Sequence, residues 1–309
     1  LDLFDGALPN KAYNTRTAKM TTYTNEVTER GIGWSAIDIA RLMVPMNIIV
    51  WNYPKHVTAV KDIVASWDFD AMLRDGTMYG TQVNEQGETE LVQEGRLGYE
   101  EYAAKSLVLM GMDASQALEY FDNVLFIEIF GEKIATDSRD PERFQAHNYI
   151  VSEPYVLDGI EFGWDQTSKE LAARVFKVQR LRYEDSGVLT AVSEDNIDQA
   201  PWFVYNTVFT DGKTWNAITD TGEDASAFRT LSTKAALGWH VLFDTEYTKE
   251  LADAVMPLQD PKKGWYSGRY EASGKPNKAL TANTNAVVLE SLAYRRFGKL
   301  VAIYKNDSE

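Results

Sequence analysis

The sequence predicts a mainly α-helical protein, an (α/α)6-type toroid in which an inner ring of helices is wrapped by an outer ring and small β-hairpins lie at the rim. Two observations support this prediction. Stretches that are apolar around most of their circumference alternate with amphipathic stretches, and short connections join them in pairs. Segments that alternate in polarity at every second residue lie between the pairs. A simple helical bundle would lack this alternation of buried and amphipathic helices.

The buried helices are predicted to begin near residues 34, 98, 152, 231 and 283. The pairs, with the buried member first, are 33–51 with 54–67, 97–110 with 114–121, 152–162 with 166–183, and 231–243 with 249–255. A fifth buried helix, 283–297, has a short or missing partner. Pro45 is expected to bend the first buried helix, and Asp113 is expected to cap the segment 114–121.

Two other segments have the two-residue period of strands. Residues 77–92 alternate around the turn Asn84-Glu85-Gln86-Gly87, and residues 124–135 alternate in the same way. Both are therefore predicted to be β-hairpins. No low-complexity linker divides the chain, so we expect a single domain over residues 1–309, with partly extended termini.

Charge and hydropathy exclude several classes of partner. The chain has 309 residues, of which 46 are acidic and 31 basic, and its formal charge is −15. This charge disfavours nucleic acids and anionic membranes as partners. The longest apolar stretch, 42–51, is interrupted by Pro45 and Asn47, so no direct membrane insertion is expected. The sequence also has no G-x-S-x-G, P-loop or dinucleotide-binding motif.

Metal and thiol chemistry find no support in the sequence. Cysteine is absent, which rules out disulfides, thiolate metal sites and cysteine nucleophiles. The three histidines, His56, His147 and His240, are scattered without the spacing of metal ligands. We therefore expect no metal and no cofactor.

The loops that lead into the buried helices are rich in Glu, Asp, Trp, Tyr, Asn and Gly. This composition suits a sugar site, because aromatic faces stack on a pyranose while carboxylates and amides bind its hydroxyls. The predicted substrate contacts are Trp34, Glu94, Arg96, Tyr99, Glu100, Tyr155, Glu161, Asn206, Trp215, Trp265 and Tyr266.

Three carboxylates, Glu101, Asp38 and Glu153, are the predicted catalytic groups. Asp38 lies in an otherwise apolar helix, where a charge is unfavourable unless it is paired or faces a polar cavity. Glu101 follows Glu100 in the first turns of a buried helix, and adjacent helical residues point about 100° apart, so only one is expected to face inward. A partly desolvated carboxyl has the raised pKa of a general acid. The alternative is a structural Glu101 that pairs with Arg96 or caps a helix terminus.

The second carboxylate of the reaction would activate water or act as the nucleophile. A separation of about 6.5–9.5 Å between the two carboxyls would indicate inversion, and about 5–5.5 Å would indicate retention. The sequence leaves this group open among Glu153, Asp158, Glu161, Glu194, Asp195, Glu223 and Asp224.

Three motifs occur in an order that matches a known group of enzymes. They are Ser35-Ala36-Ile37-Asp38, Ala65-Ser66-Trp67-Asp68-Phe69, and Gly98-Tyr99-Glu100-Glu101 leading into the apolar stretch 103–111. Over about the first 120 residues, the chain resembles the group provisionally named glucoamylases that contains bacterial endo-β-1,2-glucanases. As a whole it resembles an uncharacterised bacterial domain family found with exopolysaccharide and cell-envelope genes.

This resemblance implies an (α/α)6 barrel, a proton donor at Glu101 and a cleft aspartate at Asp38. The sequence departs from the group's motif at Glu100, where the glucanases have asparagine. Beyond about residue 125 the two sequences do not align, so the glucanases' base and linkage specificity do not carry over.

The leading hypothesis is a periplasmic or secreted bacterial glycoside hydrolase or transglycosylase that acts on a β-glucan-like polysaccharide or oligosaccharide. One alternative is a non-catalytic polysaccharide-binding component of an envelope or exopolysaccharide system, which the departure at Glu100 favours. Another is a polysaccharide lyase with an anionic substrate. The net charge weighs against a lyase, although Arg96, Lys105 or Arg269 could make a cleft locally basic.

Overall fold

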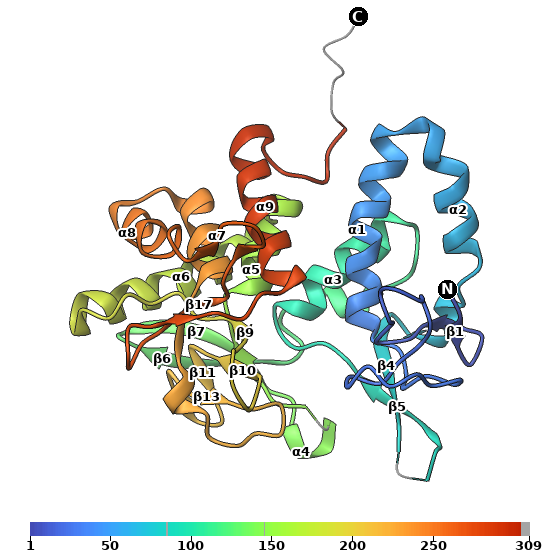
Figure 1. Cartoon of the computed structure of the whole chain (residues 1–309), viewed down its shortest axis with the longest axis horizontal. Helices are drawn as coiled ribbons and strands as arrows, with labels where there is room; N and C mark the ends of the chain where they lie inside the picture. Colours follow the sequence, from blue (N-terminus) through green and yellow to red (C-terminus); the bar gives the residue numbers. More distant parts are fainter. Residues whose placement is uncertain (85, 145, 304–309) are drawn as a thin grey trace, which may run out of the picture. The chain divides into compact units, whose positions relative to one another are not determined.

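The computed structural model describes residues 1–84, 86–144 and 146–303, and the chain divides into two compact units. The first unit is mainly Leu1–Asp122, and the second consists of Asn123–Pro141 and Ala146–Leu300 (Figure 1). Helices make up 40% of the structure and the sheets are small, in agreement with the predicted class. The single domain over residues 1–309 stays a prediction. In the described ranges, no helix is both long and apolar enough to cross a membrane.

In the first unit, helix α1 (Ala36–Asn52) packs against helix α3 (Tyr99–Leu109) and strand β4 (Thr77–Val83). The Ser35 side chain caps α1 by accepting a hydrogen bond from the N–H of Asp38. The helix then continues through its proline. The other elements of this unit are β1 (Leu3–Phe4), β2 (Leu8–Pro9), α2 (Val57–Ala65), β3 (Leu73–Arg74), β5 (Thr89–Gln93) and short 3-10 turns.

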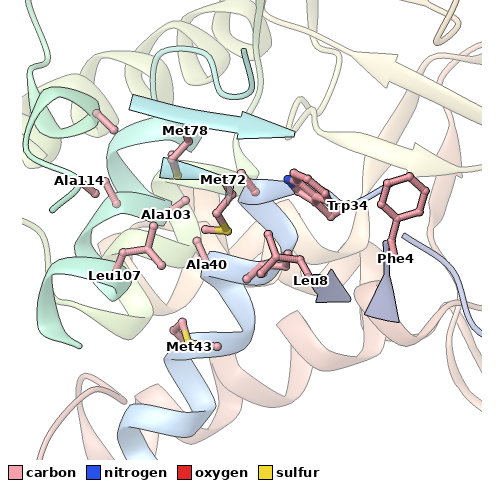
Figure 2. Packing of buried hydrophobic residues seen from close by; sticks show 14 residues of the cluster. Phe4, Leu8, Trp34, Ala40, Met43, Met72, Met78, Ala103, Leu107 and Ala114 are labelled. Carbon is pink, nitrogen blue, oxygen red and sulfur yellow. The ribbon is translucent and has the colours of Figure 1, made fainter. Parts of the chain in front are cut away.

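The core of the first unit is built from methionine, alanine and aromatic side chains (Figure 2). Met43 and Met72 are fully buried beside Ala40, whose small side chain leaves room for the neighbouring elements. Two polar groups cross this core: the Ser106 hydroxyl donates to the Ala40 carbonyl at 2.5 Å, and the Asn47 amide donates to the Ser106 carbonyl at 3.3 Å. Because these buried groups are paired, they link α1 to α3 without a desolvation penalty.

The second unit contains the longer series of helices. These are α5 (Glu153–Glu161), α6 (Gln166–Ser186), α7 (Thr233–Phe243), α8 (Glu246–Val255) and α9 (Ala282–Phe297). Helix α7 packs against α5, α8 and α9, while α6 packs against α5 and the hairpin strand β7 (Figure 1). Along α6 the residues Leu171, Val175 and Val178 form a buried apolar stripe.

Small antiparallel sheets connect these helices. The hairpin of β6 (Val124–Ile129) and β7 (Glu132–Asp137) comes first. The three-stranded sheets are β13 (Ala217–Ile218) with β10 (Phe203–Asn206) and β9 (Glu194–Asn196), β12 (Lys213–Thr214) with β11 (Phe209–Thr210) and β8 (Tyr149–Ile150), and β14 (Thr230–Ser232) with β17 (Gly268–Tyr270) and β18 (Pro276–Asn277). A two-stranded ribbon joins β15 (Gln259–Asp260) to β16 (Gly264–Trp265). The single turn α4 (Pro141–Phe144) belongs to the first unit from Glu142 onward.

All five predicted starts of buried helices are confirmed to within two residues, at 36, 99, 153, 233 and 282. Three of the four amphipathic partners are also helices, and both predicted hairpins form. Glu85 of the first hairpin turn lies outside the described residues.

The predicted helix over 114–121 is wrong. This segment holds only a 3-10 turn, Gln116–Leu118. The Asp113 carboxylate accepts hydrogen bonds from the Ser115 backbone at 3.1 Å and from its hydroxyl at 2.7 Å. This local pairing stabilises a turn, and the apolar run that follows is too short to continue as a helix.

Close packing of α5 against α7 gives a first testable prediction. A Cβ added at Gly238 would lie 2.2 Å from Cγ1 of Val156. Gly238→Ala should therefore destabilise the protein by about 1–3 kcal/mol, despite the higher helix propensity of alanine, about 1 kcal/mol. Chemical denaturation measures this change. The double variant with Val156→Ala should recover most of the loss, and equal stability of Gly238→Ala and wild type would contradict the packing.

Candidate functional site

In the first unit, the carboxyl of Glu94 lies at the N-terminus of α1. Its Oε2 accepts hydrogen bonds from the Ser35 hydroxyl at 3.0 Å and from the Ile37 N–H at 3.2 Å. The Glu94 carboxyl fills the space that a side chain at position 80 would need, because a Cβ at Gly80 of β4 would lie 2.0 Å from Glu94 Oε1. The β4–β5 hairpin therefore positions the Glu94 side chain at the start of α1.

Burial raises the pKa of Glu94 above its ordinary range. The positive charge of Lys11 and the hydrogen bonds from Ile37 and Ser35 oppose this shift, while the negative charge of Asp38 adds to it. Asp38 itself is exposed on the first turn of α1. The two acidic groups thus have different environments although they lie at one helix end.

At the start of α3, both Glu100 and Glu101 are buried, with 6% and 4% of their surface exposed. The prediction that only one of them faces inward is therefore wrong. The adjacent side chains both find polar partners inside the unit. Gln93 Nε2 donates to Glu100 Oε1 at 3.1 Å, and Glu101 Oε2 accepts a hydrogen bond from the Gly98 N–H at 2.7 Å. The second contact is a helix-capping contact.

Arg96, a predicted substrate contact, is also held inside the first unit. Its Nη1 donates to Gln93 Oε1 at 2.7 Å and to the Gly95 carbonyl at 2.5 Å, and its guanidinium lies 5.8 Å from the centre of the Phe144 ring. Because Gln93 also bonds Glu100, one amide links the arginine to an acidic side chain. This network positions the loop before α3.

Two aromatic residues predicted to contact sugar lie inside the first unit. Trp34 belongs to the hydrophobic core and packs edge-on against Phe4 (Figure 2), with 5.7 Å between the two ring centres. Its indole N–H donates a hydrogen bond to the Tyr79 carbonyl at 3.0 Å. Tyr99, the first residue of α3, is buried too. These positions indicate packing roles, and the structure leaves the predicted sugar contacts untested.

In the second unit, three side chains from the first turns of three helices form a triad, of which Glu153 and Lys234 are buried and Asn283 is partly buried. Lys234 of α7 forms an ion pair with Glu153 of α5, and its Nζ donates to Asn283 Oδ1 at 2.7 Å. Asn283 of α9 returns a hydrogen bond from Nδ2 to Glu153 Oε1 at 3.0 Å. The Glu153–Lys234–Asn283 triad therefore closes on itself and ties α5, α7 and α9 together at their N-terminal ends.

The charge at this triad is set by acidic neighbours. Burial alone would lower the pKa of Lys234, but the negative charges of Glu153, Asp195 and Glu194 outweigh it and raise that pKa. Asp195 of β9 is fully buried and accepts hydrogen bonds from the Ser232 hydroxyl at 3.1 Å and the Thr230 hydroxyl at 3.3 Å. Its burial raises its pKa to about 8. Near neutral pH, Asp195 is thus mainly protonated and Lys234 is charged.

The remaining predicted contacts in the second unit differ in exposure. Tyr155, Glu161 and Asn206 are buried, and the Asn206 amide bonds the hydroxyl and the backbone N–H of Thr230 at 3.2 and 3.3 Å. Asn206 therefore joins two strands.

Three aromatic residues of this unit are partly exposed: Trp215, Trp265 and Tyr266. The Trp215 ring lies between the Arg182 guanidinium, 4.9 Å from its centre, and the Phe130 ring at 6.4 Å. The backbone of Trp265 is held at both ends by the Asn285 amide, with distances of 2.8 and 3.0 Å, while its indole N–H has no partner among the described residues.

Among the described residues, no group of three or more His, Cys, Asp or Glu side chains could hold a metal ion. Residues 1–298 match the family described as a protein of unknown function, DUF3131. The chain belongs to the DUF3131 family. The comparison of this DUF3131 chain with curated proteins finds no match.

The fold of the DUF3131 chain is similar to several solved structures, including the following three. A protein of Bacteroides fragilis provisionally named a glucoamylase has a TM-score of 0.57 at 11% identity, over 96% of this chain and 72% of its own. Its namesake from Bacteroides caccae has a TM-score of 0.55 at 11% identity, over 92% and 70%. The endo-β-1,2-glucanase of Talaromyces funiculosus in complex with sophorose has a TM-score of 0.52 at 12% identity, over 92% and 62%. At these identities the likeness shows the fold alone.

Sequence reasoning about the DUF3131 chain missed Lys234 and Asn283. A signal was present, since each is a long polar side chain at the second position of a helix that is otherwise mostly apolar or uncharged. A lysine there is unusual, because the N-terminal end of a helix disfavours positive charge. This conflict could have indicated a buried acidic partner.

Proposed function

We propose that this chain is a glycoside hydrolase or transglycosylase that acts on a bacterial, β-glucan-like polysaccharide. The observation that carries the proposal is the placement of buried carboxyls, Glu101 and Glu153, in the first turns of helices of a fold shared with an endo-β-1,2-glucanase. Desolvated carboxyls are the groups with which glycosidases transfer protons. The (α/α)6-type toroid, the role of Asp38 in a cleft and a periplasmic or secreted location belong to this proposal.

In the proposed reaction, Glu101 gives its proton to the glycosidic oxygen while the bond from that oxygen to the anomeric carbon breaks. A second carboxylate either takes a proton from the attacking water or bonds the anomeric carbon first. In transfer, a sugar hydroxyl takes the place of water. The second group stays open among the seven acidic residues that the sequence offers. Glu153 is one of them, and its ion pair with Lys234 favours the charged form that either role needs.

A specific observation favours the non-catalytic alternative. Glu101 caps its own helix through the Gly98 N–H, and Glu153 is held by Lys234 and Asn283. Both carboxyls therefore have structural partners. A polysaccharide-binding component would keep such groups without needing an acid and a base.

The first test is incubation of the protein with purified bacterial polysaccharides, including β-1,2-glucan, with chromatography of the products. Cleavage or transfer supports the enzyme. Binding without a product supports the binding component, and an unsaturated product from an anionic polysaccharide supports a lyase.

Glu101→Gln is expected to lower turnover on a cleaved glucan by about 10²–10⁴-fold, because the amide has no transferable proton. Fold and sugar binding should persist, since the amide oxygen can still accept the Gly98 hydrogen bond. Initial rates of product release measure the effect. Glu88→Gln, at an exposed position of the β4–β5 hairpin, is the matched control. Full activity of Glu101→Gln would remove the proton-donor assignment.

A further inference from the structure

Strand β6 lies beside β7 in a two-stranded sheet (Figure 1), and its other edge pairs with no strand among the described residues. The register of the two strands is regular, without a bulge. The sequence of β6, VLFIEI, has one charge, Glu128, and neither proline nor lysine. Natural proteins usually protect an open edge with charges, proline or a bulge. The open edge of β6 therefore has little protection against pairing with a further strand.

Both faces of β6 carry exposed apolar side chains. Successive residues of a strand point to opposite faces. Leu125, on one face, is 57% exposed, and Phe126, on the other, is 53% exposed. Packing within the unit thus leaves apolar surface uncovered on both sides of the same edge, which is typical of an interaction surface.

The turn after β6 decides which backbone groups point to the open edge. Phe130 and Gly131 form this turn, and both have positive φ values, 51° and 76°, as in a two-residue hairpin turn. The pair that flanks such a turn, here Ile129 and Glu132, is a hydrogen-bonded pair. In an antiparallel ladder, hydrogen-bonded pairs recur at every second residue. The odd-numbered residues of β6 therefore direct their backbone groups toward β7.

The beginning of the hairpin agrees with this alternation. The Ser138 N–H donates to the carbonyl of Asn123, an odd-numbered residue, at 2.9 Å. The N–H and C=O groups of Val124, Phe126 and Glu128 consequently point away from β7. Three residues of each β6 edge can thus exchange hydrogen bonds with an added strand.

We propose that the β6 edge pairs with the β6 edge of a second copy of this chain, antiparallel and around a two-fold axis at Phe126. A hydrogen-bonded pair needs an outward-pointing residue on both strands. In a symmetric dimer the same surface serves both copies. Only the register with Phe126 opposite Phe126 of the second copy uses all three outward-pointing residues on both strands.

Side chains favour a second copy as the occupant, because this register is self-complementary. Leu125 comes opposite Ile127 of the second copy, in a non-hydrogen-bonded pair, where the side chains approach closest. Glu128, the only charge of β6, comes opposite Val124, so no like charges face each other directly. A second copy thus satisfies the hydrogen bonds and the apolar side chains of the edge without a charge clash.

Disulfide cross-linking tests the register, because the chain has no cysteine of its own. Equimolar Leu125→Cys and Ile127→Cys, one of them labelled with ¹⁵N, should form mainly the mixed disulfide on mild oxidation. The mixed pair would have its Cα atoms about 4.5 Å apart, within disulfide range, whereas two copies of one variant would have theirs about 7–8 Å apart. Mass spectrometry measures the three products. A mixed product only twice as abundant as either pure one, the ratio of random collision, would overturn the proposal.

Sedimentation at increasing concentration measures the association itself. Wild type should approach twice the mass of the single chain, more readily at high salt, because the charge of −15 on each copy opposes association. Phe126→Lys places two like charges at the two-fold axis and should raise the Kd of the dimer by about tenfold or more. Leu289→Lys on α9, where the leucine is 60% exposed, is the matched control and should associate like wild type.

The outcomes are independent of glycan cleavage, so they separate this proposal from the proposed function. A wild type that stays monomeric up to about 1 mM would overturn the proposal. A dimer that Leu289→Lys dissociates and Phe126→Lys does not would assign the interface to α9 and also overturn it. If circular dichroism shows that Phe126→Lys does not fold, the ratio of cross-linked products decides.

Discussion

Replacing Lys234 by methionine is expected to lower the free energy of unfolding by about 3–5 kcal/mol. The variant removes the positive charge that pairs with Glu153, whose carboxylate is fully enclosed. It also removes the hydrogen bond to Asn283. A buried charge without its counter-ion is strongly unfavourable, whereas the methionine stem fills nearly the same volume. Urea denaturation at neutral pH measures the change.

The control for this prediction removes both charges together. A double variant, Lys234→Met with Glu153→Leu, should regain much of the lost stability, because replacing a whole buried ion pair by apolar groups is often nearly neutral. If the single variant is as stable as wild type, the ion pair does not hold the N-terminal ends of α5, α7 and α9 together. If the double variant is much less stable than the single one, Glu153 has other essential partners.

The helices could be predicted from the sequence because their signals are local and long. An apolar stretch such as the one that becomes α7, or the stripe Leu171, Val175 and Val178 of α6, extends over several turns and shows its period clearly. Strands of two or three residues, such as β14 and β17, are too short to show an alternation. Their pairing depends on residues almost forty positions apart, which no local pattern contains.

The carboxylates at the helix starts could be predicted, but their partners could not. Glu101 was identified from its place in the first turns of a buried helix and from the motif around it, and Glu153 from the acidic composition of the loops that lead into the buried helices. Lys234 lies 81 positions from Glu153, and only the packing of α5 against α7 brings the two together. The surroundings of Trp34 could not be predicted for the same reason. Its glycine neighbours suggested a surface loop, while Thr81 and Tyr79 of β4 bind its backbone and indole N–H groups.

The free energy of unfolding of wild type is expected to depend on pH, and Asp195→Asn should abolish most of that dependence. Asp195 keeps its proton in the folded state up to about pH 8, whereas the unfolded chain releases it near the ordinary value of 3.8. Between these values the folded state binds more protons, so wild-type stability should fall as the pH rises, by up to about 1.4 kcal/mol per pH unit from this group. Asparagine cannot ionise, and its amide can still bond the Ser232 and Thr230 hydroxyls.

The free energy of unfolding should be measured for both proteins from about pH 4 to about pH 8, where the linkage acts. Asp253→Asn on the exposed face of α8 is the matched control and should keep the wild-type slope. The variant's advantage over wild type should grow steadily with pH and level off above pH 8, because both states of wild type are then ionised at Asp195. The same slope in Asp195→Asn and wild type would mean that Asp195 is ionised in the folded protein at neutral pH. Lys234 would then interact with two buried carboxylates, Glu153 and Asp195, and the triad together with Asp195 would carry a net negative charge.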